Sequence, residues 1–262
     1  MSAKADNCSS KAPVFRPGVL APGGTPTMND AMLNQVAWIG DQYLHGPVRG
    51  IVLRFSGLGA TGLKDGADPM EMEWGQAGAL VVQPYHDPWA WMNPATLAFV
   101  DELVSGLFAR YALAPDTPVI ATGGSRGGHG ALLYTLRSSY SVAACAANCP
   151  VCDLPFHYTE RPDLPRTMHH AFGSYGDISE ALTAHSPLHQ AVRMPDVPYL
   201  IIHGEEDRAV GKAQHSDKLV AALRGRGLTV DYREQPNMGH CGPFDWTLYR
   251  RMTDFVLEQL KG

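Results

Sequence analysis

The sequence contains no long apolar run, since nowhere do about eighteen apolar residues follow one another. We therefore expect no membrane-spanning helix and no membrane partner. Residues 1–26 also lack the basic start and apolar core of a signal peptide. A cytoplasmic location follows as an expectation, although a secreted chain trimmed of its signal would have the same sequence.

Charged residues make up 18% of the chain, an ordinary share for a globular protein, and no excess of positive charge is present. Lys and Arg number 21 against 26 Asp and Glu, which gives a formal net charge of -5, and the basic residues form no cluster. A protein that follows a phosphate backbone needs such a cluster. Nucleic acid is therefore not an expected partner.

Five cysteines, an odd number, are spread through a chain too large to need disulfide staples, so we expect reduced thiols. Cys149 and Cys152 have the CxxC spacing of redox and zinc sites, but there is no second CxxC. Because they follow the apolar run 142–147, we interpret them as small buried residues at a strand end, with a redox role as a distant alternative. Neither a metal nor a cofactor is expected.

From residue 48 onward, short apolar runs alternate with helical patterns. This alternation predicts an α/β fold with a mostly parallel central sheet and helices on both faces. A chain of 262 residues can bury one large core, so we expect a single domain, residues 1–262. The expected strands are 48–55, 79–83, 119–122, 142–147, 199–203 and 228–233, and the expected helices are 95–111, 127–138, 213–224 and 247–260.

Two regions depart from this alternation. Residues 1–43 form an N-terminal extension that has room for a peripheral strand or helix, but no pattern places one. Residues 151–197 carry five prolines among several His, Tyr and Phe residues. Such a stretch between two core strands predicts an inserted cap or a long loop, and long loops are often functional. Whether it closes over a site stays open.

The central functional signal is the G-x-S-x-G segment Gly123–Gly127, which follows a β-rich run and leads into a helical pattern. In a strand, tight turn and helix of this kind, Ser125 presents its hydroxyl above the sheet, and the glycines let strand and helix pass without Cβ clashes. The helix N-terminus behind the serine favours developing negative charge. Because a plain Gly-rich turn also matches this pattern, the assignment depends on partner residues.

A carboxylate follows the next-to-last expected strand. The segment 203–210 reads H-G-x-x-D-x-x-V and places Asp207 just beyond the strand end, where α/β sheets build their sites. Asp207 is therefore the expected acid of a triad. Glu205 and Glu206 are the competing candidates, and a solvated acidic turn is the alternative.

A histidine lies late in the chain, in the loop between the last expected strand and the last expected helix. His240 sits between glycines in this loop and completes the order Ser, Asp, His that α/β hydrolases use. We expect His240 to be the base that activates Ser125, although a lone loop histidine is more often a surface residue.

Two backbone N–H groups are expected to bind the oxyanion. One belongs to Arg126, directly after the nucleophile. The other comes from the loop after strand 48–55, where Leu58 is our choice and Gly57 or Gly59 the alternatives. The side chain of Arg126 is expected either to reach a polar group of the substrate or to contact a neighbouring helix.

Residues 123–128, 203–210 and 239–240 resemble the catalytic domain of the prolyl oligopeptidase-like branch of α/β hydrolases, over roughly residues 48–260. The resemblance implies the α/β-hydrolase fold and the triad, but it is less specific for substrate, since acetyl xylan esterase-like and dienelactone hydrolase-like enzymes share these motifs. Oligopeptidases of this branch carry a large N-terminal propeller, for which 262 residues are too few. The usual His-Gly-Gly oxyanion loop is replaced here by residues 55–59. Both departures favour an esterase.

The loop 84–94 follows a core strand and should lie beside the triad. Trp89, Trp91 and Asp87 are therefore candidate substrate-binding residues, with capping of the core as the equal alternative for the tryptophans. We interpret the acidic residues after strand 48–55, which include Asp65, Asp68 and Glu71, as a solvated polar loop. His169 and His170 have no matching ligand set, so no metal is expected there.

We therefore expect a serine hydrolase that forms an acyl-enzyme, most simply a carboxylesterase acting on small or carbohydrate-linked esters. The alternative is a peptidase or aminopeptidase on short peptides, which needs an acidic group such as Glu71, Glu73 or Asp87 for the free amine. A non-catalytic binding protein is the third hypothesis, against which the intact order of Ser, Asp and His argues. A small ester or short peptide is the expected partner, and the oligomeric state stays open.

Overall fold

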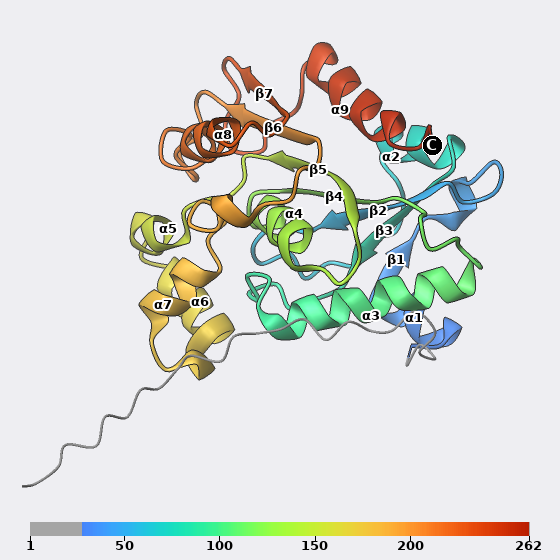
Figure 1. The fold of residues 1–262 in the computed structure, drawn as a ribbon, viewed down its shortest axis with the longest axis horizontal. Helices are drawn as coiled ribbons and strands as arrows, with labels where there is room; N and C mark the ends of the chain where they lie inside the picture. Colours follow the sequence, from blue (N-terminus) through green and yellow to red (C-terminus); the bar gives the residue numbers. More distant parts are fainter. Residues whose placement is uncertain (1–27, 262) are drawn as a thin grey trace, which may run out of the picture.

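Seven strands form one sheet in the computed structural model, which describes residues 28–261. The order across the sheet is β1-β3-β2-β4-β5-β6-β7, and every neighbouring pair is parallel except β1 with β3 (Figure 1). The carboxyl ends of the six parallel strands therefore meet at one edge. The strands are β1 (Ala37–Ile39), β2 (Gly50–Phe55), β3 (Ala79–Pro84), β4 (Val119–Gly124), β5 (Val142–Asn148), β6 (Tyr199–Gly204) and β7 (Val230–Gln235).

Helices cover both faces of the sheet, as apolar strands buried on both sides require. One face packs against α1 (Asp30–Val36), α3 (Pro94–Arg110), α4 (Arg126–Arg137) and α8 (Ser216–Gly225). The other packs against α2 (Pro69–Gln76) and α9 (Trp246–Glu258). These two layers form separate apolar clusters, and the predicted α/β fold with a mostly parallel sheet is confirmed. No helix of residues 28–261 is both long and apolar enough to cross a membrane.

The segment 151–197 contains three short helices that pack together beside the sheet, which we name the cap (Figure 1). They are α5 (Leu154–Glu160), α6 (Leu164–Phe172) and α7 (Ile178–Ala184), with a short 3₁₀ turn at Gly173–Tyr175 between α6 and α7 and another at Ala191–Arg193 after α7. Pro155 and Pro165 lie in the first turns of α5 and α6, where a missing N–H costs nothing. Two of the prolines that disrupt the sequence pattern thus begin helices.

Two stretches for which the sequence predicts no helix or strand form regular elements in the structure. Residues 30–43 form α1, β1 and the 3₁₀ turn Asp41–Tyr43. The rest of the predicted extension, residues 1–27, lies outside the described residues, and it includes Cys8 and the segment without signal-peptide features. The prediction of a solvated polar loop around Asp68 and Glu71 is wrong, because these residues belong to the start of helix α2. Asp68 caps α2, Glu71 completes a capping box, and the Glu71 side chain is buried against Arg54 and Lys64.

Candidate active site

Ser125 occupies the sharp turn between β4 and α4, with φ 57° and ψ -125°. This left-handed backbone exposes the side chain at the carboxyl edge of the sheet. A Cβ on Gly123 would lie 2.4 Å from the carbonyl carbon of Gly127, and one on Gly127 would lie 2.1 Å from the carbonyl oxygen of Phe55. Both glycines of the motif are therefore required by the close approach of β2, β4 and α4.

The three residues predicted to form a triad lie in hydrogen-bond contact. His240 Nε2 lies 2.8 Å from Ser125 Oγ, and His240 Nδ1 lies 2.7 Å from Asp207 Oδ2. The loop before α9 brings His240 to this position because it passes close over the end of β6: a Cβ on Gly204 would lie 2.1 Å from the carbonyl oxygen of Met238. The glycine of the H-G-x-x-D pattern thus makes room for the histidine loop.

The Asp207 side chain is fully buried and accepts three hydrogen bonds. Its Oδ1 accepts the N–H groups of Ala209 and Val210, and its Oδ2 accepts from His240 and lies 3.2 Å from His203 Nε2, which also contacts the Val210 carbonyl. Burial alone would raise the pKa of Asp207, but the interactions with His203, His240 and Val210 outweigh it and lower that pKa. Asp207 is therefore a carboxylate that accepts the Nδ1 proton of His240.

Burial and the contact with Asp207 act on the pKa of His240 in opposite directions. Burial lowers its pKa, but the hydrogen bond and the negative charge of Asp207 more than compensate, so the pKa lies above the usual 6.5. The Nδ1 proton is held by Asp207, and Nε2 therefore turns its lone pair toward the Ser125 hydroxyl. The competing acids Glu205 and Glu206 are exposed.

Backbone N–H groups surround the space next to Ser125. Arg126 is the first residue of α4, so its N–H has no carbonyl of a preceding turn to bind. Within residues 28–261, the N–H groups of Gly57 and Leu58 have no acceptor, whereas that of Gly59 donates to the Pro88 carbonyl. Leu58 and Gly57 thus remain candidates for the second oxyanion donor.

The Arg126 side chain neither points into open space, where it could reach a substrate, nor contacts a neighbouring helix. It is buried, and its Nη2 donates to the carbonyl oxygens of Ser56 at 2.9 Å and Gly57 at 3.1 Å. Because C=O and N–H point in opposite directions in a trans peptide, these bonds turn the Gly57 and Leu58 N–H groups away from Arg126. Burial lowers the pKa of Arg126 to about 10, so the guanidinium stays charged at neutral pH.

A cavity of about 450 Å³ opens beside Ser125 and His240. Trp91 lines it, is fully buried, and donates its indole N–H to Thr167 of the cap. Trp89 and Asp87, the other predicted binding residues, do not line it. Trp89 packs against the edge of His170, and Asp87 accepts a hydrogen bond from His170. The other lining residues are Gly57, Leu58, Gly124, His157, Arg161, Val210 and Cys241.

The acidic residues considered as binders of a substrate amine lie elsewhere. Glu71 is held by Arg54 and Lys64. Glu73 pairs with Arg250 on the face covered by α2 and α9. None of these carboxylates, nor that of Asp87, lines the cavity.

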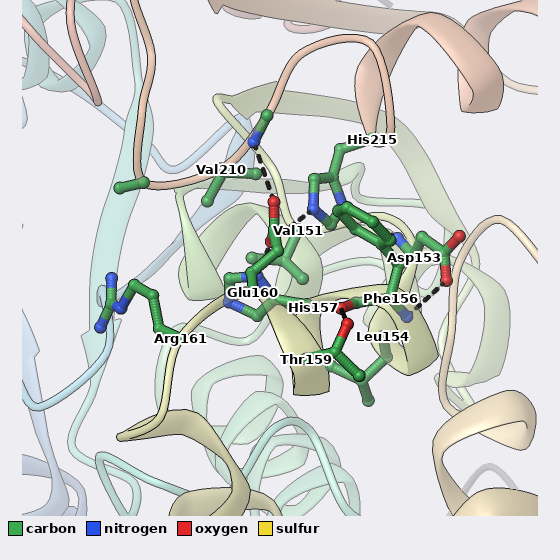
Figure 2. A network of polar contacts seen from close by, with 12 residues as sticks. Val151, Asp153, Leu154, Phe156, His157, Thr159, Glu160, Arg161, Val210 and His215 are labelled. Carbon is green, nitrogen blue, oxygen red and sulfur yellow. Dashed lines mark hydrogen bonds and ion pairs between the residues drawn. The ribbon is translucent and has the colours of Figure 1, made fainter.

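The cap supplies two lining residues that the sequence patterns did not identify, His157 and Arg161. Figure 2 shows His157, Glu160 and His215 pointing toward one another, with Arg161 directed away from them. Glu160 Oε2 accepts from His157 Nδ1 and, at 3.0 Å, from His215 Nε2, while its Oε1 accepts from the Gly211 N–H. We name these three side chains the Glu160 clamp. His157, Glu160 and Arg161 lie close together in the sequence, but no local pattern connects Glu160 with His215, 55 residues away.

The Glu160 clamp has the residue types of a metal site, but its hydrogen bonds favour another role. His215 Nδ1 accepts the N–H groups of Cys152 and Asp153, so the ring proton is on Nε2, the atom that faces Glu160. A metal would need the lone pair of that atom. Burial would raise the pKa of Glu160, but the bonds from His157 and His215 lower it to about 2, which makes it a carboxylate acceptor.

The predicted histidine pair lies apart from any group of converging ligands. His169 contacts the Tyr158 hydroxyl, and His170 contacts Asp87. Within residues 28–261, the remaining groups of metal-ligating type both contain Cys149, one with Cys241 and His240 and one with His203 and Asp207. Cys149 therefore lies near Cys241 rather than acting with Cys152 as a CxxC pair.

Comparison with solved structures finds the same fold in larger peptidases. A puromycin-hydrolysing peptidase from Mycobacterium tuberculosis matches 83% of this chain with TM-score 0.66 and 18% identity, and the Pyrococcus horikoshii acylaminoacyl peptidase matches 86% with TM-score 0.69 and 16% identity. The chain covers only 35% and 39% of their lengths, and thus spans well under half of either. A truncated carbohydrate esterase from gut microbiota matches 86% with TM-score 0.61 and 18% identity, and 96% of its own length is covered.

The family assignment rests on the sequence itself. A search of curated proteins found no match. The prolyl oligopeptidase family, however, matches residues 100–262, a range that is more than half of the chain and includes Ser125, Asp207 and His240. The resemblance seen in the motifs is confirmed, and the chain belongs to the prolyl oligopeptidase family.

Proposed function

We propose that this protein hydrolyses short peptides or acyl amides through an acyl-enzyme on Ser125. The observation that carries the proposal is the continuous set of hydrogen bonds from Ser125 Oγ through His240 to the buried Asp207. Nucleophile, base and orienting carboxylate thus have the contacts that nucleophilic catalysis needs.

In the proposed mechanism, Ser125 Oγ attacks the substrate carbonyl carbon while His240 Nε2 takes the hydroxyl proton. Asp207 holds the Nδ1 proton and stabilises the imidazolium that forms. The N–H groups of Arg126 and Leu58 bind the oxyanion, with Gly57 as the alternative to Leu58. His240 then gives its proton to the departing amine, and water repeats the sequence to release the acid.

Membership of the prolyl oligopeptidase family and the likeness to peptidases favour an amide substrate over the ester suggested by the motifs alone. The residues that line the cavity beside Ser125 indicate which amide substrates it can accept. Its lining contains no carboxylate, and the guanidinium of the lining residue Arg161 is already paired with Asp163, so the cavity offers nothing to neutralise a free amine. Blocked substrates, in which the residue next to the scissile bond carries an acyl or peptidyl group, therefore suit this cavity better than substrates with a free N-terminus.

A carboxylesterase is the second candidate. The observation in its favour is that the truncated carbohydrate esterase is matched over 96% of its own length. Esters and amides pass through the same acyl-enzyme, and an ester has the better leaving group, so the triad alone does not separate the two classes.

A panel of chromogenic substrates tests both candidates. It would compare N-acetyl-aminoacyl p-nitroanilides, unblocked aminoacyl p-nitroanilides and p-nitrophenyl esters from acetate to octanoate, with Ser125→Ala as control and folding checked by circular dichroism. We expect blocked anilides to be cleaved with higher kcat/KM than unblocked ones, and the mutant to be inactive.

Turnover of esters without any anilide would replace the main proposal with the carboxylesterase. If Ser125 in folded wild-type protein fails to react with a fluorophosphonate probe, both candidates are overturned, and the hypothesis of a non-catalytic binding protein is supported.

A further inference from the structure

Two thiols lie directly behind the proposed catalytic histidine. Cys149 follows the end of β5, Cys241 follows His240, and both are free. The N–H of Cys241 donates to Cys149 Sγ at 3.4 Å. Both sulfur atoms and one ring nitrogen of His240 lie within 4.8 Å of one another. Residues 92 positions apart in the sequence thus bring two sulfurs and an imidazole together.

The backbone at both thiols is unfavourable for a side chain. Cys149 has φ 45° and Cys241 has φ 49°, in the left-handed region that suits glycine or asparagine. Neither position holds the residue that would relieve this strain. Strained non-glycine residues cluster at functional sites, so a use for the sulfur atoms is the natural hypothesis.

The pair can be reached from outside through Cys241. Cys149 is fully buried, but Cys241 is partly exposed and lines the cavity next to Ser125. A second hollow, of about 670 Å³, lies against Gly57, Gly124 and Cys241 as well. A small ion that enters either space meets the Cys241 sulfur first and Cys149 behind it. The other cysteine-containing group, Cys149 with His203 and Asp207, is buried throughout.

The ligand types define the ion. Two thiolates and an imidazole are the donors that Zn²⁺ and its softer analogue Cd²⁺ prefer, whereas Mg²⁺ and Ca²⁺ prefer oxygen. Three protein ligands leave the fourth tetrahedral position open toward the cavity for water.

We propose that Cys149, Cys241 and His240 form an inhibitory binding site for a soft divalent cation, Zn²⁺ or Cd²⁺. Binding releases the two thiol protons to solvent and takes a lone pair of the His240 ring. The imidazole can then no longer both bind Asp207 and accept the Ser125 proton, so the hydrolase is switched off while the cation stays bound. The inhibition rests on the proposed function, but the binding does not.

Cadmium binding is measured first, because thiolate coordination gives a charge-transfer absorption in the ultraviolet that needs no enzyme activity. The full chain would carry Cys8→Ser, be reduced, and be freed of reductant before titration with CdCl₂. We expect the absorption to saturate at one ion per chain. Cys149→Ser should weaken binding at least about 100-fold, since losing even an outer partner of a metal ligand costs 10–100-fold. The matched control Cys145→Ala removes a buried thiol of β5 and should bind as the parent does.

If Cys149→Ser does not fold, Cys241→Ser, at a partly exposed position, takes its place with the same expectation. An absent band in the parent chain, or an undiminished band in the serine variants, overturns the site.

Inhibition is measured second, on whichever substrate the parent chain turns over, with each variant compared with its own metal-free rate. Cd²⁺ and Zn²⁺ should inhibit over the range in which the absorption appears, EDTA should restore the rate, and Mg²⁺ should have no effect. Inhibition of Cys149→Ser at the same Cd²⁺ concentration as the parent would contradict the proposal. A chain that binds Cd²⁺ but hydrolyses nothing would leave the site in place and reject the proposed function instead.

Discussion

At the scale of single residues, Arg126 contributes to the site in two ways. Its N–H is a proposed oxyanion donor, and its guanidinium holds the carbonyls of Ser56 and Gly57 in the loop that supplies the other donor. The start of α4 places the first donor, and the Arg126 side chain sets the position of the second. A donor that is displaced from the oxyanion costs about as much as a donor that is removed.

Arg126→Met should lower kcat by about 100-fold, since the loss of one oxyanion donor costs 10²–10³-fold. Arg226→Met is the matched control, because Arg226 also binds two carbonyls, those of Ala191 and Met194, but away from Ser125. The control should lose stability without a comparable loss of kcat. Steady-state kinetics with urea unfolding of both variants decides the matter, and equal kcat losses would contradict the role given to Arg126.

The pKa of His240 sets the acid limb of the pH profile. Asp207 raises this pKa above 6.5, and only the neutral imidazole can take the Ser125 proton. We therefore expect kcat/KM to rise with pH through a midpoint above 6.5, measured across about pH 5 to 8. Asp207→Asn removes the charge that holds the Nδ1 proton and should lower kcat by about 10⁴-fold. A midpoint below 6.5 in the wild type would contradict this account.

At the scale of elements, the site depends on the contact between the end of β6 and the loop that carries His240. Gly204→Ala would place a methyl group 2.1 Å from the Met238 carbonyl and push this loop away. We expect a loss of about 1–3 kcal/mol in unfolding free energy and, from the shift of His240, about 100-fold in kcat. In the control Gly239→Ala, the new methyl group has open space. Circular dichroism melts and kinetics of both variants test this, and an unaffected Gly204→Ala would contradict it.

The elements that the sequence predicts well are those whose signals are local. The strand, turn and helix around Ser125 lie within one short segment, and the order of Ser, Asp and His along the chain predicts the other two members of the proposed triad at the same sheet edge. The helix α2 was missed although Asp68 and Glu71 have the spacing of a capping box, because its polar residues suggested a loop.

Contacts between distant segments could not be predicted in this way. The bond between Glu160 and His215 spans 55 residues, and that between Cys149 and Cys241 spans 92. The role of Trp91 as a cavity wall depends on its bond to Thr167 in the cap, 76 residues away. No periodicity or spacing encodes such pairs, since they arise only when the cap packs against the sheet.

At the scale of the whole molecule, the cap has its own apolar cluster, which includes Trp91 and Val210 from the body of the protein. Two further bonds tie the cap to the body: Trp91 to Thr167, and the Asn93 side chain to the Ala171 carbonyl. On the other side, the Glu160 clamp joins α5 to His215 and the Gly211 N–H. The cavity lies between these attachments, so its shape depends on how the cap is held.

The Glu160 clamp should make part of the stability depend on pH. The pKa of Glu160 falls from 4.5 to about 2 on folding, so its contribution is complete above pH 4.5 and is lost as the pH falls toward 2. Glu160→Gln should lower the unfolding free energy by about 1–3 kcal/mol at neutral pH, because the amide nitrogen cannot accept a hydrogen bond.

Urea unfolding at a series of pH values measures this difference between wild type and Glu160→Gln, with the exposed Glu205→Gln as control. The difference should shrink as the pH falls below 4.5, because the protonated carboxyl loses the charge that both histidines bind. A difference that stays constant down to about pH 2 would mean that Glu160 holds the cap by packing rather than by its charge.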